Sequence, residues 1–254
     1  MRIYGDNIIS DTTLTASSVK AGYDVDNLKI AQLGKRFSFD GNSGTILIGL
    51  IVSTNIKHCI IDIGNMSSSA TVTLEGNSTN VWTSPPYTKS LTYTESSFYA
   101  DINETYQFWR LSIEDTTKTS VELGYISIGG AYTQMPMIDY KAEIFYKTTA
   151  QNSISIGGQI YGDDGYEYLE TTFKFPQIEE ASTTFNGVTV ANRKEIKALY
   201  LELKNITPFW VMLWAENLDE YAPVFCIFNQ NKISFMKTDY TKVYSTKLSL
   251  REVL

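Results

Sequence analysis

Hydrophobic positions along the chain fall into short runs rich in β-branched and aromatic residues, and clusters of Asn, Gly, Ser, Thr and Asp separate these runs. This punctuation is typical of an all-β sandwich or barrel, because strands are short and the turns between them need special backbone geometry. In the first half, the runs predict strands at Thr45–Val52, Lys57–Ile63, Ala70–Leu74, Tyr106–Ile113 and Val121–Ile128.

Two of these runs also indicate how side chains divide between the faces of a sheet. Between Trp109 and Ile113 every second residue is apolar, so one face is expected to be buried while Arg110 points the other way. In Val121–Ile128 the apolar positions change parity at Gly124. That change predicts either a bulge at this glycine or a strand covered on both sides.

The second half combines strands with one segment of helical periodicity. From Ala191 to Lys204 apolar residues recur at spacings of three and four, and charged residues occupy the opposite side. The pattern predicts an amphipathic helix, capped by Thr189 or Asn192, that packs on a sheet. Strands are predicted at Tyr140–Tyr146, Ser153–Tyr161, Tyr168–Phe175, Phe209–Trp214, Val224–Phe228, Lys232–Met236 and over the last residues, 244–251. Pro176 is expected to end the third of them.

A break in the periodic pattern lies at Gly129–Met137, where Gly-Gly, Ala, Thr, Gln and Pro interrupt the runs. The chain has 254 residues, which is long enough for two ordinary domains. We therefore predict two mainly β domains, residues 1–133 and residues 137–254.

Charge and hydropathy narrow the classes of partner. The 28 acidic residues outnumber the 21 basic ones, for a formal net charge of -7, and the basic residues are scattered along the chain. Such a chain does not attract a phosphate backbone, so nucleic acid is not an expected partner. The apolar runs are far shorter than the roughly 20 residues that span a bilayer, and residues 1–20 lack the apolar core of an export signal. We expect no membrane insertion and synthesis in the cytoplasm.

Reactive side chains are few. Cys59 and Cys226 lie in apolar runs and are expected to be reduced and buried. His58 is the single histidine, and neighbouring strand residues point to opposite faces, so it cannot pair with Cys59 as a base with a nucleophile. Common nucleotide-binding, nucleophile-elbow and zinc-binding motifs are missing from the sequence. We predict no catalytic residue, no metal site and no cofactor, and we do not expect an enzyme.

Two acidic clusters are better explained by structural roles than by metal binding or catalysis. The segment Tyr161–Glu167 does not match the ligand spacing of a calcium loop, and its Asp and Gly residues are typical of a hairpin turn. Glu179 and Glu180 are sequential neighbours, so we expect a solvated surface pair rather than the separated acid and base of a glycosidase.

Aromatic residues in loop-like stretches form the remaining candidate site. Tyr23, Trp82 and Tyr87 could stack on sugar rings, and Pro85 and Pro86 would stiffen the loop that presents Trp82. The alternative is that the three side chains cap the sandwich core, because large aromatic side chains are usually buried. The sequence leaves both interpretations open.

Six segments of the first half occur in a recognisable order: Leu14–Ser18, Gly22–Tyr23, Asp26–Leu28, Cys59–Asn65, Trp109–Ile113 and Leu123–Gly129. This series, which covers about the first 130 residues, resembles the galactose-binding-like, or discoidin-like, jelly-roll domain found in many phage tail proteins. The resemblance implies an antiparallel jelly-roll sandwich of two packed sheets.

Four markers follow in the second half: Gly157–Tyr161, Phe173–Pro176, the helix before Pro208–Trp210, and Leu248–Val253. They resemble a domain of phage minor or distal tail proteins, including those of gene-transfer-agent particles. The resemblance implies a structural virion protein of the tail tip, in a symmetric ring or collar that contacts copies of itself and other tail proteins. The alternative function is a carbohydrate-binding module that attaches the particle to host-surface glycan through the loop aromatics.

Overall fold

The computed structural model describes residues 1–32, 34–136, 143–150, 152–154, 160–162, 165–185, 188–204, 206–212, 223–238 and 243–253. Contacts divide the chain into two compact units. Unit 1 contains Met1–Thr133 with Phe209–Val224, and unit 2 contains Gln134–Pro208 with Phe225–Leu254. The two domains 1–133 and 137–254 stay a prediction.

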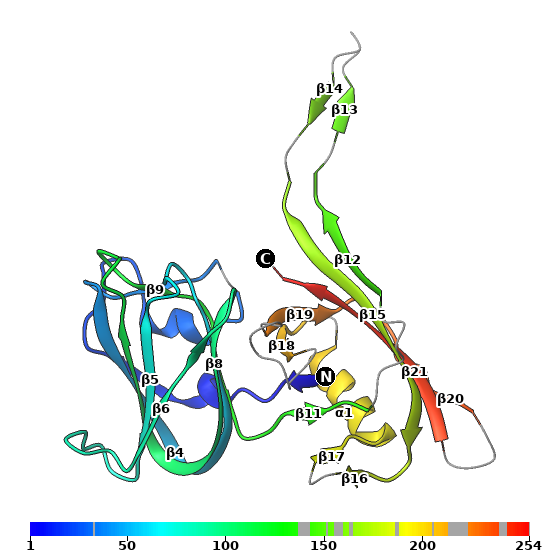
Figure 1. Cartoon of the computed structure of the whole chain (residues 1–254), viewed down its shortest axis with the longest axis horizontal. Helices are drawn as coiled ribbons and strands as arrows, with labels where there is room; N and C mark the ends of the chain where they lie inside the picture. The colour runs from blue at the N-terminus through cyan, green and yellow to red at the C-terminus, as the bar shows by residue number, and fades with distance from the viewer. Residues whose placement is uncertain are drawn as a thin grey trace. The chain divides into compact units, whose positions relative to one another are not determined.

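Unit 1 is an antiparallel jelly-roll sandwich built around two long strands, β4 (Ser43–Asp62) and β8 (Ser97–Glu114) (Figure 1). Their sheet has the order β10-β4-β8-β5-β6, and β2 joins β4 while β7 joins β8. The register of the long pair shifts between Gly49 and Thr54, where β4 bulges. The two strands predicted at Thr45–Val52 and Lys57–Ile63 are therefore parts of one bent strand.

The other elements of unit 1 are short. Its 3-10 helices are η1 (Ile8–Asp11) and η2 (Val25–Lys29), and its remaining strands are β1 (Arg2–Tyr4), β2 (Thr13–Ala16), β3 (Phe37–Ser38), β5 (Thr71–Asn77), β6 (Tyr87–Ser90), β7 (Thr92–Tyr93), β9 (Glu122–Leu123), β10 (Ile126–Gly129) and β18 (Phe209–Met212). Strand β1 pairs antiparallel with β18, and β3 pairs with β9. Strand β11 (Thr133–Gln134) lies at the division between the units.

The predicted strand Val121–Ile128 is divided at Gly124. Strand β9 pairs with β3 and strand β10 pairs with β4, and every residue of β10 is buried. A Cβ at Gly124 would lie 1.9 Å from Asp62 Oδ2, so only glycine fits where the chain changes partner. The predicted single strand is therefore two short strands with different partners and not one bulged strand, and of these β10 is buried throughout.

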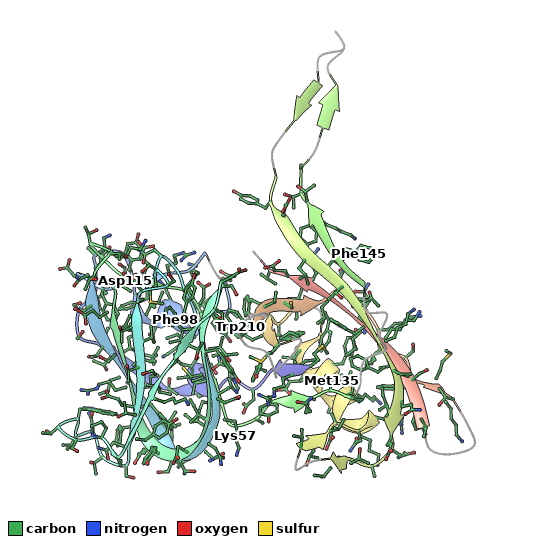
Figure 2. All side chains as sticks on the ribbon, viewed as in Figure 1. Lys57, Phe98, Asp115, Met135, Phe145 and Trp210 are labelled. Atoms are coloured by element: carbon green, nitrogen blue, oxygen red, sulfur yellow. The ribbon has the colours of Figure 1, made fainter. Side chains whose placement is uncertain are left out.

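The core of unit 1 confirms the alternation read from the sequence. Trp109, Leu111 and Ile113 are at most 2% exposed, and Figure 2 shows Phe98 within the same unit. Burial of each large apolar side chain contributes about 1.5–3 kcal/mol relative to exposure. Arg110 lies between the first two of these residues and is half-buried on the opposite face.

Unit 2 contains a sheet in the order β19-β21-β15-β12, with β20 paired to β21. The strands of this unit are β12 (Glu143–Thr148), β13 (Asn152–Ile154), β14 (Ile160–Gly162), β15 (Glu167–Glu179), β16 (Thr183–Phe185), β17 (Val188–Val190), β19 (Val224–Phe228), β20 (Met236–Lys237) and β21 (Val243–Glu252). The long hairpin of β12 and β15 continues into the paired strands β13 and β14 (Figure 1).

The predicted amphipathic helix is α1 (Arg193–Leu203). Asn192 caps its start in a capping box with Glu195, which decides between the two expected caps. The helix packs on the sheet through Tyr200, whose ring centroid lies 5.1 Å from that of Phe228 in β19. No described helix is long and apolar enough to cross a bilayer.

Three strand predictions in unit 2 need correction. The segment predicted as one strand at Ser153–Tyr161 contains parts of two strands, β13 and β14, which pair antiparallel with Ser153 opposite Tyr161. Strand β15 does not end at Pro176 but runs to Glu179, with a register shift between Phe175 and Ile178. A bulge accommodates proline because no ladder hydrogen bond is required there. The segment predicted at Lys232–Met236 is largely without strand structure, and only its last residue belongs to β20. Most of its side chains are partly or fully exposed, so no burial fixes an extended pairing.

Candidate functional site

A groove lies on the outward face of the sheet in unit 1, where β2, β4 and β8 are neighbours. It encloses about 310 Å³, at the lower end of the roughly 300–1,000 Å³ typical of small-molecule pockets. Its walls come from the end of η1, the three strands and the loop after β5, through Asp11, Thr13, Thr15, Leu47, Gly49, Leu50, Ile51, Asn80 and Phe108.

Strand register sets the floor of this groove. Thr13 of β2, Gly49 of β4 and Phe108 of β8 lie opposite one another. Because Phe108 precedes the buried Trp109 and neighbouring strand residues point to opposite faces, the Phe108 side chain points outward. An added Cβ at Gly49 would meet only the Thr13 carbonyl oxygen within 4 Å, at 3.9 Å. The missing side chain at Gly49 therefore leaves the space beside Phe108 open.

The adjacent row of residues extends the floor toward an ion pair. Thr15, Leu47 and Arg110 lie opposite one another on β2, β4 and β8. Arg110 Nε donates to Glu75 Oε2 of β5 at 2.5 Å, and the two side chains are 24% and 13% exposed. Leu47 therefore lies between the Thr15 hydroxyl on β2 and the ion pair of Arg110 with Glu75 on the other side.

The loop after β5 forms one wall of the groove. Asn77 Nδ2 donates to the Val81 carbonyl oxygen at 2.6 Å and closes a turn. The Arg110 guanidinium lies over the Trp82 ring, 4.8 Å from its centroid, in a cation–π contact. Trp82 Nε1 donates to Asn80 Oδ1 at 2.7 Å. Trp82 therefore anchors the loop and orients Asn80, whose Nδ2 is left to donate to a ligand.

The structure does not bring the three predicted aromatic residues together. Trp82 borders the groove, as described above. Tyr87 packs on the core side of the sheet, with its ring centroid 5.9 Å from that of Trp109. Tyr23 lies beside Lys20, whose Nζ is 5.4 Å from the ring centroid. A glycan-binding role of Tyr23, Trp82 and Tyr87 stays a prediction, and only Trp82 lies next to the groove.

Most residues of the groove were missed by the sequence analysis. The available signal was Phe108, which shares the parity of Arg110 and is therefore an aromatic residue on a face expected to be polar. Thr13, Leu47 and Asn80 carry no local signal, because their proximity depends on the register of strands and on the shape of a loop.

His58 and the cysteines form no reactive centre. Burial of His58 lowers its pKa to about 3, so the ring is neutral near pH 7, and its Nε2 lies 3.3 Å from Ser127 Oγ. Burial also raises the pKa of the Cys59 and Cys226 thiols. Both cysteines are free and buried, which confirms the prediction.

The acidic clusters also form no metal site among the described residues. Glu180 differs from the expected solvated residue, because it accepts hydrogen bonds from Arg193 Nη2 and the Tyr244 hydroxyl, both at 3.2 Å. The described residues contain no group of three metal-ligating side chains. The prediction of a hairpin turn at Tyr161–Glu167 is wrong, because the flanking strands β14 and β15 pair with β13 and β12 and not with each other. Asp163 and Asp164 of this segment lie outside the described residues.

Comparisons with known proteins gave partial structural likenesses. Neither the protein-family models nor the curated proteins gave a match. The chain is similar to the CBM32 of AlyQ in complex with 4,5-unsaturated mannuronic acid, at 17% identity over 51% of this chain and 98% of that one, with a TM-score of 0.41. A Streptococcus pneumoniae fucose binding module is similar at 12% identity over 49% and 95% of the two chains, with a TM-score of 0.42.

A third similar structure is chitosan-binding module 1 from the chitosanase/glucanase of Paenibacillus sp. IK-5. It is 19% identical over 49% of this chain and 98% of that one, with a TM-score of 0.38. At these identities and scores, the matches say nothing about the function of this chain.

Proposed function

We propose that this chain binds carbohydrate, and that the groove of unit 1 holds a short stretch of glycan. The observation that carries the proposal is the combination of apolar and polar side chains in one groove of small-ligand size. Leu47 and Phe108 contribute apolar surface, and Thr13, Thr15 and Asn80 contribute polar groups beside it.

This combination matches the two-sided chemistry of a sugar ring. A pyranose ring presents C–H groups on its faces and hydroxyl groups around its edge. The outward ring of Phe108 offers an apolar surface for one face, and the open space at Gly49 admits the sugar. The threonine hydroxyls can donate and accept hydrogen bonds, and the amide of Asn80 can donate.

The groove is also organised before any ligand arrives. Five of its residues, Thr13, Thr15, Leu47, Gly49 and Phe108, lie on strands whose pairing fixes the backbone. The Arg110 contact with Trp82 holds the loop. A site of this kind loses little conformational entropy on binding, which favours useful affinity from a small contact area.

A substitution at Gly49 tests the proposal most cleanly. Gly49→Val places a branched side chain beside Phe108, where the added Cβ meets no close atom, so the fold should keep its melting temperature. We expect glycan affinity to fall at least about tenfold, which corresponds to ~1.4 kcal/mol. Isothermal titration with a panel of oligosaccharides measures this change.

Matched variants accompany that measurement. Phe108→Ala should weaken binding by a similar factor, because it removes the apolar floor. Tyr23→Ala removes an aromatic side chain of the same unit outside the groove and should bind as the wild type does. Unchanged affinity of the Gly49→Val and Phe108→Ala proteins would contradict the proposed site.

A second candidate function is a structural subunit of a phage tail tip, located in the virion. The supporting observation is strand β12, which pairs with β15 on one side and, among the described strands, with none on the other. Figure 2 shows Phe145 on this strand, and its side chain is 49% exposed. Open strand edges with apolar side chains are places where subunits associate. In this proposal copies of the chain form a ring, contact other tail proteins, and present the groove to host-surface glycan.

A further inference from the structure

The charge in the groove comes from one residue. Asp11 is the only ionisable side chain among the nine residues that line it. The side chain is exposed, and none of the ion pairs formed by the described residues includes it. The Asp11 carboxylate therefore lies at the groove without an ion-pair partner among the described residues.

The fold holds Asp11 in this position from both ends of η1. At the start of the helix, Asn7 Nδ2 donates to the Tyr125 hydroxyl at 2.6 Å, and Asn7 Oδ1 accepts from the Ile128 backbone N–H at 3.0 Å. At its end, the buried Thr12 donates through Oγ1 to the Ile9 carbonyl oxygen at 2.8 Å. The carboxylate thus belongs to a fixed turn and not to a loose loop.

Arg110, a cation on the same face of the sheet, does not offset this charge. Arg110 donates to Glu75, and its guanidinium is covered on one side by the Trp82 ring. An ion pair has no net charge, so it adds little to the field in the groove. The groove therefore presents a net negative charge beside its apolar floor.

From this arrangement we infer that the groove selects uncharged glycan and discriminates against acidic sugars, and that Asp11 is the specificity-determining residue. The inference rests on the proposed function. The Asp11 carboxylate accepts hydrogen bonds from sugar hydroxyls, and such charge-assisted bonds are stronger than neutral ones. A uronate carboxylate in the same place is repelled. Two like charges about 4 Å apart in water repel by ~1 kcal/mol, or about fivefold in affinity.

The test uses pairs of sugars that differ at C6, where the hydroxymethyl group of the neutral sugar is replaced by the carboxylate of the uronate. Oligomers of galactose, glucose and mannose are compared with the oligouronates of the same stereochemistry, linkage and length, in isothermal titrations. We expect the wild type to bind the neutral member of a recognised pair at least about fivefold more tightly. Asp11→Asn should narrow that ratio by about the same factor, mainly by improving the binding of the uronate.

Two controls test whether the preference for neutral sugar comes from the charge of Asp11 or from the overall charge of the protein. Asp40→Asn removes one exposed carboxylate of the same unit outside the groove and should leave the ratio unchanged. Salt at about 1 M shortens the screening length to about 3 Å, so it should narrow the ratio of the wild type but not that of the Asp11→Asn protein.

The outcomes separate a failure of the inferred specificity from a failure of carbohydrate binding itself. If neutral and acidic members bind alike, or if Asp11→Asn leaves the ratio unchanged, the inference is wrong while carbohydrate binding stands. A preference for uronates overturns the inference in the same way. If no member of any pair binds, the proposed function itself is contradicted.

Discussion

Asp115 carries a carboxylate that is almost completely buried at the edge of the jelly roll, where Figure 2 labels it. Its oxygens accept hydrogen bonds from the Ser67 backbone N–H at 2.6 Å, the Thr117 backbone N–H at 3.0 Å and the Thr117 hydroxyl at 2.6 Å. Burial alone would raise the pKa of Asp115, but these hydrogen bonds outweigh it and lower the pKa to about 2. The charged side chain ties two loops together.

Replacement of Asp115 by Asn should destabilise the protein by about 1–3 kcal/mol, because the amide nitrogen cannot accept hydrogen bonds. In the unfolded chain the carboxyl group has a pKa of about 3.9. Its stabilising contribution is therefore complete above about pH 4 and is lost as the pH falls through about 2. Urea unfolding at pH 7 and pH 3 should show a larger gap between the wild type and Asp115→Asn at pH 7. Equal stabilities at pH 7 would refute this account.

At the scale of elements, Trp82 is interpreted as a positioning residue of the loop rather than as a platform for sugar. Trp82→Phe keeps an aromatic ring over Arg110 but removes the hydrogen bond to Asn80. We expect this variant and Asn80→Ala each to weaken glycan binding about fivefold, as loss of one hydrogen bond of ~1 kcal/mol does.

The double variant discriminates between the two roles of Trp82. If Trp82 acts through Asn80, then Trp82→Phe combined with Asn80→Ala should bind no more weakly than Asn80→Ala alone. Additive losses in titrations of all three proteins would show instead that Trp82 contacts the sugar directly.

Elements with a strong internal period could be predicted from the sequence, and elements defined by their partners could not. Helix α1 and strand β21 followed from apolar residues at helical and alternate spacing, which reflect one buried face. The continuity of β4 through its bulge was missed, because polar and exposed residues between Val52 and Ile56 resemble a loop in the sequence. The groove was missed for the same reason, since it arises from the register of Thr13, Gly49 and Phe108 across three strands.

At the scale of the whole molecule, the sequence predicted a mainly β chain with a jelly-roll sandwich and one helix packed on a sheet, and the structure confirms that fold class. Composition and motifs offered no reactive centre, and for a ligand site they offered only Tyr23, Trp82 and Tyr87, for which core packing was also an open interpretation. Surface shape depends on contacts between distant segments, so the true lining of a groove is not visible in local patterns.

Association through the open edge of β12 is a second property of the whole molecule that can be measured. Phe145→Glu places a charge on the exposed edge strand and should reduce concentration-dependent self-association in analytical ultracentrifugation. Met236→Glu, which alters another exposed apolar side chain of unit 2, serves as the matched control. Both proteins should bind glycan normally. A wild type that remains monomeric at every concentration would count against the structural role.

The central claim is that the outward groove of the jelly-roll unit is a carbohydrate site. A crystal structure of the protein with the tightest-binding neutral oligosaccharide tests it directly. We predict a sugar ring whose face lies on Phe108, with hydroxyl groups bonded to Thr13, Thr15, Asn80 or Asp11. A sugar bound instead beside Tyr23 or Tyr87, with the groove empty, would contradict the claim.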